Sequence, residues 1–98
     1  MSERAPARAL PVPESAGAAR ALEVCTEKLR AGVSCVLSTV IGRHGSTPST
    51  PGQKLVLAFD EVAVGTVGGG AVEREVLEAM LVLKESGEPH VEIGRAHV

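Results

Sequence analysis

Residues 62–80 limit what this chain can fold into more than any other stretch of the sequence. Their first part contains Val62, Val64 and Val67, which favour a half-buried β-strand. Three consecutive glycines follow at positions 68–70. Glycine has no Cβ, so this turn can take positive φ angles and let another group approach the backbone. After the turn, apolar residues recur at helical spacing: Val72, Val76, Met80 and Leu83. The stretch therefore predicts a strand, a glycine turn and a helix.

A glycine turn at the start of a helix suits an anionic group, because it presents N–H donors and the positive end of the helix dipole. Residues 68–73 partly match a dinucleotide-binding fingerprint, but Glu73 stands where the third glycine belongs. Glu73 has two open interpretations: it compensates the helix dipole, or it binds N–H groups of the turn or an amino group of a ligand. A purely structural role for the glycines, close packing of the turn, also stays open.

A second polar segment, residues 42–52, contains three glycines, two prolines and four hydroxyl residues, which together forbid a regular element. It does not match a phosphate-binding P-loop, because six residues separate Gly45 from Gly52 and Gln53 stands where lysine is required. Its hydroxyl and basic side chains suit a polar ligand site opposite the glycine turn. A solvated surface loop fits the same residues equally well.

Composition narrows the class of protein. The 98 residues form at most one domain, and a core of Val, Leu and Ala with one aromatic, Phe59, must rely on many small contacts. A net charge of −2 gives no electrostatic preference for nucleic acid or an anionic membrane. No apolar run reaches transmembrane length and the first residues do not resemble a signal peptide, so we expect a cytoplasmic protein.

The chemistry-bearing side chains do not form a catalytic arrangement. Cys25 and Cys35 make no CxxC pair, and we interpret them as reduced thiols in the core. His44 and His90 lack metal-ligand spacing, so no metal site is predicted. Enzymatic activity stays open, but the sequence favours a function other than catalysis.

The first predicted helix begins near Ala16, with Ser15 as its N-cap, and ends at Gly32. Its apolar stripe has helical spacing and consists of Ala18, Leu22, Cys25 and Leu29. Residues 1–14 are rich in Pro, Ala and Arg without periodicity, and we expect them to be a disordered lead-in.

The remaining elements follow from the same patterns. Residues 33–41 are apolar on both faces, which predicts a central strand, and residues 53–58 and 62–67 predict a hairpin with a tight turn at 59–61. A second helix should run from Ala71 to Ser86 with Gly87 as its cap, and residues 89–92 should start a further strand. The fold class is mixed α/β, in the order helix, strand, loop, β-hairpin, helix and strand, with the sheet packed against the helices.

The last residues, 93–98, look foreign to the rest of the chain. They back-translate, with allowed codons, to ATC GGA AGA GCA CAC GTC, which matches an adapter used in common short-read sequencing libraries. We therefore expect a truncated domain over residues 15–92 followed by a non-native tail.

Two motifs together carry a family resemblance. Residues 38–54 resemble a strand followed by G-S-x-P-x-x-P-G-x-(K/R), and residues 64–73 resemble G-T-(I/V)-G-G-G-x-x-E. The pair is similar to the N-terminal domain of the XdhC/CoxI family, accessory factors of xanthine dehydrogenase and aerobic carbon monoxide dehydrogenase. The positions that match include Pro48 and Pro51 as well as the predicted cofactor-binding residues, which are Gly45, Ser46, Gly52, Gly68, Gly69, Gly70 and Glu73.

The resemblance implies a chaperone for the molybdenum cofactor. Members of that family bind molybdopterin transiently while a cysteine desulfurase supplies sulfur, and then deliver it to the apo form of a xanthine dehydrogenase-type enzyme. Some relatives carry Cys directly after the glycines, where this chain has Ala71, which puts handling by a thiol at that position in doubt. Many relatives also have a Rossmann-like second domain, for which this sequence has no counterpart.

Two other functions stay open. The chain could be a fragment of a nucleotide-dependent oxidoreductase that uses the glycine turn as a dinucleotide loop. It could also be a structural dimerisation domain whose ligand chemistry lies elsewhere. We expect no nucleic acid or membrane as a partner, whereas a homodimer is compatible with the sequence.

Overall fold

The computed structural model describes residues 10–42 and 50–87. The elements are α1 (Ala18–Arg30), β1 (Cys35–Thr39), β2 (Lys54–Ala58), β3 (Ala63–Gly65) and α2 (Gly70–Ser86). The strand expected at 89–92 and the suspected tail at 93–98 lie outside the described residues.

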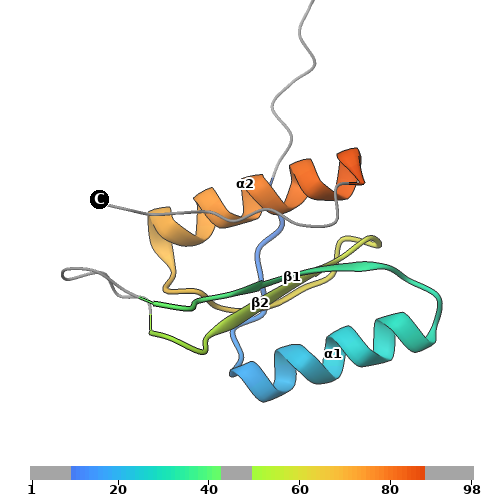
Figure 1. Ribbon diagram of the computed structural model, residues 1–98, viewed down its shortest axis with the longest axis horizontal. Helices are drawn as coiled ribbons and strands as arrows, with labels where there is room; N and C mark the ends of the chain where they lie inside the picture. Colours follow the sequence, from blue (N-terminus) through green and yellow to red (C-terminus); the bar gives the residue numbers. More distant parts are fainter. Residues whose placement is uncertain (1–9, 43–49, 88–98) are drawn as a thin grey trace, which may run out of the picture.

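The described elements form three layers, with α2 on one face of the sheet and α1 on the other (Figure 1). The sheet has the order β1-β2-β3, and both pairings are antiparallel. The predicted mixed α/β class is therefore confirmed. Side chains alternate between the two faces along each strand. Leu55 and Leu57 pack in the cluster with Leu77 and Met80 of α2, whereas Val56 packs with Ala21 and Val24 of α1.

The central strand is β2, and the prediction that residues 33–41 form a covered central strand is wrong. β2 is flanked on both sides, and its residues 55–58 are fully buried. Among the described strands β1 lies at the edge, and its Leu37 is 41% exposed. The order follows from the short connections of an antiparallel meander, which place the second strand in the middle whatever the hydrophobicity of the first.

Helix α1 buries a different face from the one predicted. Ala21 and Val24 are buried against the sheet, while Leu22 and Leu29 are 42% and 57% exposed. Cys25, half-buried, belongs to both the predicted and the observed face. The first turn also differs, because Gly17 rather than Ser15 occupies the N-cap and no side chain caps the helix.

The C-terminus of α1 forms a Schellman motif around Gly32. Gly32 takes a φ of 83°, its N–H donates to Leu29 O at 3.0 Å, and Val33 N–H donates to Lys28 O at 2.8 Å. The predicted end at Gly32 is therefore confirmed, with glycine supplying the left-handed residue that closes the helix.

Helix α2 lies close to its prediction. It starts one residue early, at Gly70, and Gly87 closes it with a φ of 76° and an N–H bond to Leu83 O at 2.9 Å. Its buried residues are Leu77, Met80 and Leu81. Of the predicted stripe only Met80 is fully buried, and Leu77 and Leu81 were missed because the buried arc is rotated by about one residue.

The predicted hairpin between β2 and β3 is confirmed, and both helices hold its turn. Glu61 takes the left-handed conformation with a φ of 75°. Lys28, near the end of α1, pairs with Asp60 at 2.6 Å, and Lys84, near the end of α2, pairs with Glu61 at 2.9 Å. Lys84 Nζ also lies 6.0 Å from the centre of the Phe59 ring.

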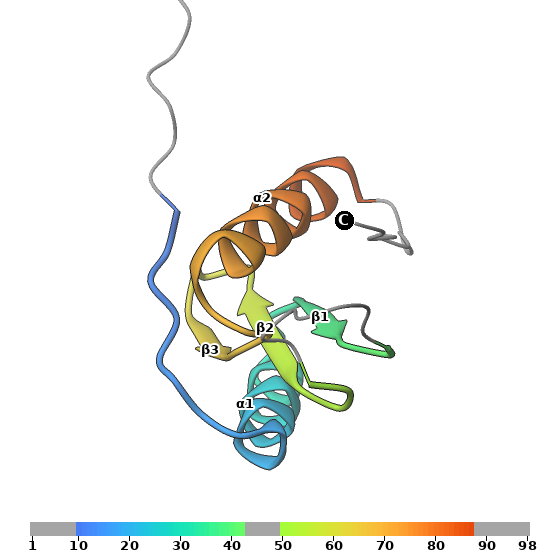
Figure 2. The same cartoon turned by 90° about the vertical axis from the view of Figure 1, so that its left-hand side faces the viewer.

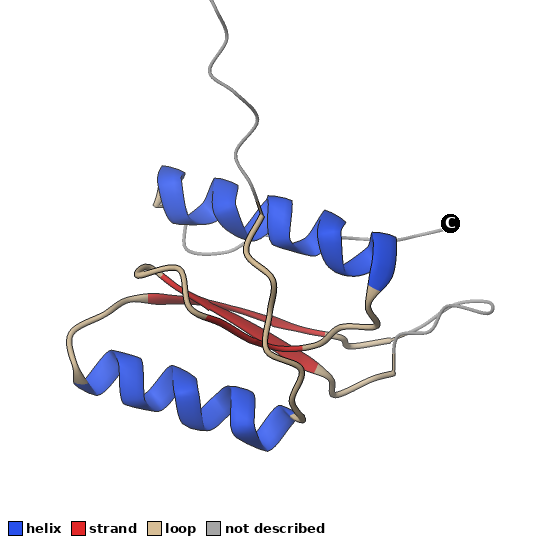
Figure 3. Ribbon diagram, turned by 180° about the vertical axis from the view of Figure 1, so that it is seen from behind, coloured by secondary structure: helices blue, strands red, loops and turns tan. Residues whose placement is uncertain are grey.

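Part of the expected lead-in lies along the sheet. Residues 1–9 fall outside the described range, but Glu14 forms a parallel bridge with Val64. Its N–H donates to Ala63 O at 2.9 Å, and its carbonyl accepts from Gly65 N–H at 2.8 Å. The segment passes the outer side of β3 on its way from the α2 layer to the α1 layer (Figures 2 and 3). The β3 edge is thereby covered, while the described residues leave the β1 edge open.

Candidate functional site

The strand register brings the two sequence motifs to one end of the sheet. Thr39 at the end of β1 pairs with Lys54 at the start of β2, and Gly65 at the end of β3 pairs with Leu55. The β1–β2 connection and the glycine turn therefore leave the sheet at the same end. Both helices also begin at this end, on the left in Figure 1. We call it the loop end.

Only some of the predicted site residues are among those that the structure describes. Gly45 and Ser46 lie outside the described residues, whereas Gly52 and the glycines at 68–70 are placed at the loop end with Glu73. Gly52 takes a φ of 94°, and its N–H donates to Val40 O at 2.7 Å, which closes the base of the β1–β2 connection. Gly52 therefore shapes the loop, and its N–H is already used within the chain.

Gly65 is a glycine that the sequence analysis did not single out and that the fold requires. Its φ is 116°, and a Cβ at this position would lie 2.1 Å from Lys54 O, a backbone atom that cannot rotate away. The next residue, Thr66, donates its N–H to the same Lys54 O at 2.9 Å. This close approach of β3 to β2 fixes where the glycine turn begins.

Glu73 fills the concave side of the glycine turn. Its Oε1 accepts hydrogen bonds from Thr66 Oγ1 at 2.8 Å, Val67 N–H at 3.1 Å and Gly69 N–H at 3.2 Å. Thr66 Oγ1 in turn accepts from Gly68 N–H at 3.1 Å. Of the two interpretations of Glu73, the one in which it binds N–H groups of the turn describes the structure. The turn is not an open phosphate seat, because a carboxylate of the same chain already occupies these donors.

The donors left over belong to the first turn of α2. Gly70 and Ala71 are exposed. Their N–H groups lie in the first turn of the helix, where no carbonyl of the helix itself can accept a hydrogen bond from them. They have no acceptor within the described residues. They also carry the positive end of the α2 dipole, which Glu73 partly offsets. This position suits a hydrogen-bond acceptor group better than it suits a dense negative charge.

Other polar groups at the loop end come from the strands. Lys54 Nζ donates to Thr39 Oγ1 at 3.3 Å, and both side chains lie on the face of the sheet that carries α1. Thr50 N–H donates to Gln53 Oε1 at 2.8 Å. Within residues 10–42 and 50–87, no three His, Cys, Asp or Glu side chains gather as a metal site would require.

The two thiols lie inside the molecule rather than at this end. Cys25 and Cys35 are free, half-buried and packed against the core between α1 and the sheet. Burial raises the pKa of Cys35 to about 11, and the neighbouring Cys25 thiol adds to this shift. Cys35 is therefore protonated at neutral pH, as expected of a small apolar core residue.

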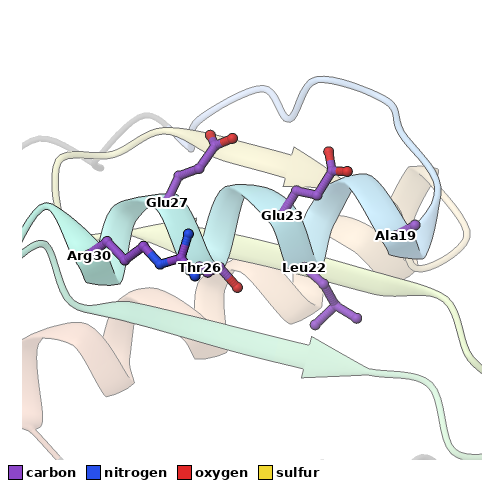
Figure 4. Close-up of a pocket in the computed structure, with 6 residues that line it drawn as sticks. All are labelled: Ala19, Leu22, Glu23, Thr26, Glu27 and Arg30. Atoms are coloured by element: carbon purple, nitrogen blue, oxygen red, sulfur yellow. The ribbon is translucent and has the colours of Figure 1, made fainter.

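A shallow, open surface lies along the outer face of α1, and none of the predicted site residues lines it. It is lined by Ala19, Leu22, Glu23, Thr26, Glu27 and Arg30 (Figure 4). The predicted apolar stripe of this helix placed Leu22 in the core, so the exposed surface was not expected. Among the described helices, none is long and apolar enough to cross a lipid bilayer.

Comparisons with known proteins support the family resemblance that the two motifs predict. The model of the XdhC and CoxI family matches residues 28–94, which include both motifs. The chain is also 41% identical over 59 residues to an uncharacterized protein, YqeB of Escherichia coli (strain K12). That match covers 60% of this chain but only 11% of the length of YqeB. No solved structure matches the chain significantly.

Proposed function

The chain belongs to the XdhC and CoxI family, and we propose that it binds the molybdenum cofactor while a xanthine dehydrogenase-type enzyme is matured. An accessory role for molybdenum hydroxylases follows from the family. The proposal adds transient cofactor binding, delivery to the apoenzyme in the cytoplasm and a cysteine desulfurase as the sulfur source.

The observation that carries this proposal is the meeting of both motifs at the loop end. Residues 38–54 and 64–73 are separate in the sequence, yet the pairing of Thr39 with Lys54 and of Leu55 with Gly65 brings their ends together. A ligand that contacts both motifs has to sit at this end of the sheet. A binding protein needs such a surface but no catalytic residues.

The residues present fit an organic cofactor rich in hydrogen-bonding groups. The exposed N–H groups of Gly70 and Ala71 would serve acceptor atoms of the ligand, and Lys54 supplies a positive charge on the other face of the same end. When bound, the cofactor supplies the molybdenum and dithiolene chemistry, and this chain contributes binding and shielding from water. Ala71 offers no thiolate, and the described cysteines are packed in the core, so we assign no sulfur ligand to this domain.

A matched pair of substitutions tests the site. Glu73→Ala removes the acceptor of three hydrogen bonds that shape the glycine turn, whereas Glu75→Ala removes an exposed carboxylate from the same turn of α2. We expect Glu73→Ala to weaken binding of the molybdenum cofactor at least about tenfold, since an unformed turn must be ordered on binding. Glu75→Ala should bind like the wild type.

The measurement is retention of molybdenum and pterin on gel filtration, followed by activation of an apo-dehydrogenase. Wild-type protein that neither retains cofactor nor raises the activity of the apoenzyme would refute the proposal. Calorimetry with NAD(P) tests whether the glycine turn is a dinucleotide loop. The Glu73 carboxylate, which already accepts hydrogen bonds from N–H groups of the turn, argues against that alternative. Tight NAD(P) binding without molybdopterin binding would favour that oxidoreductase instead.

A further inference from the structure

Helix α1 carries a second apolar stripe that its own domain does not bury. Ala19, Leu22, Thr26 and Leu29 follow one another at spacings of three, four and three residues. This is the spacing of a seam between two helices. Leu22 is 42% exposed and Leu29 is 57% exposed, whereas the core-facing residues Ala21 and Val24 lie on another side of the helix.

The apolar surface continues onto the edge strand. Leu37 of β1 is 41% exposed and pairs with Val56, so its side chain points to the face of the sheet that carries α1. Because α1 lies mainly over β2 and β3, it covers this face of β1 at Cys35 but leaves Leu37 exposed within the described residues. Figure 4 shows Leu22 projecting from α1 toward the side on which β1 lies. Leu22, Leu29 and Leu37 together form what we call the α1–β1 surface.

The stripe is complementary to a reversed copy of itself. In an antiparallel pair of α1 helices, Ala19 lies opposite Leu29 of the second copy, and Leu22 lies opposite Thr26. Each large side chain thus meets a small one, which lets two helices approach closely. A two-fold axis repeats every such contact.

The charges beside the stripe match the same arrangement. Glu23 and Arg30 are one heptad apart on one flank of the stripe, positions that meet across the seam of an antiparallel pair. Within residues 10–42 and 50–87, Arg30 has no ion-pair partner, whereas Glu23 contacts Arg20 at 3.2 Å with a side chain that is 64% exposed. A second copy would pair Glu23 with Arg30 twice.

We propose that the α1–β1 surface is the interface of a homodimer, formed by antiparallel packing of α1 on the α1 of a second copy. The occupant is a copy of this chain because both the sizes and the charges along the stripe match their own reversed order. The seam contains none of the predicted cofactor-binding residues, so the interface does not depend on the cofactor.

A charge exchange tests the pairing. Glu23→Arg places only positive charge at the two flanking positions, and Arg30→Glu places only negative charge there. We expect each variant alone to raise the dimer dissociation constant about tenfold, because two favourable pairs become two repulsive ones. An equimolar mixture of the two variants should restore dimers, since opposite charges then meet. Glu78→Arg, on an exposed position of α2, is the control and should dimerise like the wild type.

Sedimentation velocity of the full chain over a range of concentrations measures these constants. Leu29→Asp should give monomers with an unchanged far-UV circular dichroism spectrum, because Leu29 is not part of the core. Wild-type protein that stays monomeric up to about 1 mM would overturn the proposal. A mixture of the two charge variants that does not dimerise better than either alone would overturn the antiparallel arrangement.

Discussion

At the scale of single residues, Glu73 and Gly65 explain the glycine turn better than its three consecutive glycines do. Glu73 brings a carboxylate to N–H groups that otherwise suit a phosphate, so the chain supplies its own anion. Gly65 lets β3 approach Lys54 O so closely that no side chain fits. The turn is thus shaped by contacts within the chain before any ligand arrives.

Replacement of Gly65 by alanine should destabilise the domain severely. The Cβ would meet Lys54 O at 2.1 Å, and the φ of 116° is unfavourable for any residue with a side chain. We expect Gly65→Ala to lower the free energy of unfolding by about 3 kcal/mol or more. Gly87→Ala, at a φ of 76° and a ψ of 7° in the left-handed region with no atom within 4 Å of its Cβ, should cost only about 1 kcal/mol.

Urea denaturation followed by circular dichroism distinguishes the two variants. Equal midpoints for Gly65→Ala and Gly87→Ala would contradict the close approach of β3 to β2.

At the scale of elements, the β2–β3 hairpin is the point where the two helical layers are joined. Its turn offers Asp60 to Lys28 of α1 and Glu61 to Lys84 of α2. Both lysines lie in the last turn of their helices, where a positive charge also interacts favourably with the helix dipole. Two charge pairs on one short turn therefore hold α1 and α2 at the end of the sheet opposite the loop end.

The Asp60 pair should make stability depend on acid pH. The hydrogen bond from Lys28, followed by that from Val62 N–H, lowers the pKa of Asp60 below its ordinary value of 3.8. Because the folded-state pKa is the lower one, the stabilisation is complete well above pH 3.8 and is lost as the pH falls through the folded-state value.

Asp60→Asn should remove this part of the pH dependence, and thermal unfolding between about pH 2 and pH 6 measures it. The variant should be less stable than the wild type at neutral pH, and the difference should shrink in acid. Glu78→Gln, which removes an exposed carboxylate of α2, serves as the control. A difference between Asp60→Asn and the wild type that grows in acid would show that the Lys28 contact does not stabilise the fold.

At the scale of the whole molecule, one buried strand holds the three layers together. β2 pairs with a strand on each side and packs against both helices, so its amides should open only when the domain unfolds.

The chain matches just 11% of the length of YqeB, so the activity of a complete relative stays part of the proposal.

Amide hydrogen exchange followed by NMR should show this gradient. Residues 55–58 should exchange slowest, at rates set by global unfolding. Just before and just after β1, Ser34 O accepts from Phe59 N–H and Val40 N–H donates to Gln53 O. Backbone groups that face the neighbouring strand alternate along an antiparallel strand, so the N–H of Leu37 points away from β2 to the open edge. Leu37 should therefore exchange much faster than Leu57 in monomeric protein. Equal protection of the two amides would place another element on the β1 edge.

Sequence alone determined the elements whose causes are local. The hairpin, α2 and the caps at Gly32 and Gly87 all follow from turn chemistry and helical spacing within a few residues, and all are present. The two motifs also carried the family before any coordinates were considered. The two chemical options for Glu73 could likewise be stated from its position three residues into a helix.

Tertiary structure decided what depends on neighbours distant in sequence. Helix α1 has two apolar arcs, and only its packing on the sheet selects the arc with Ala21, a residue small enough for close approach, and leaves Leu22 and Leu29 outside. The position of β1 at the edge of the described strands follows from strand order, which hydrophobicity does not encode. The need for Gly65 comes from a carbonyl eleven residues earlier, at Lys54. In each case the deciding contact is long-range, so it exists only once the layers have assembled.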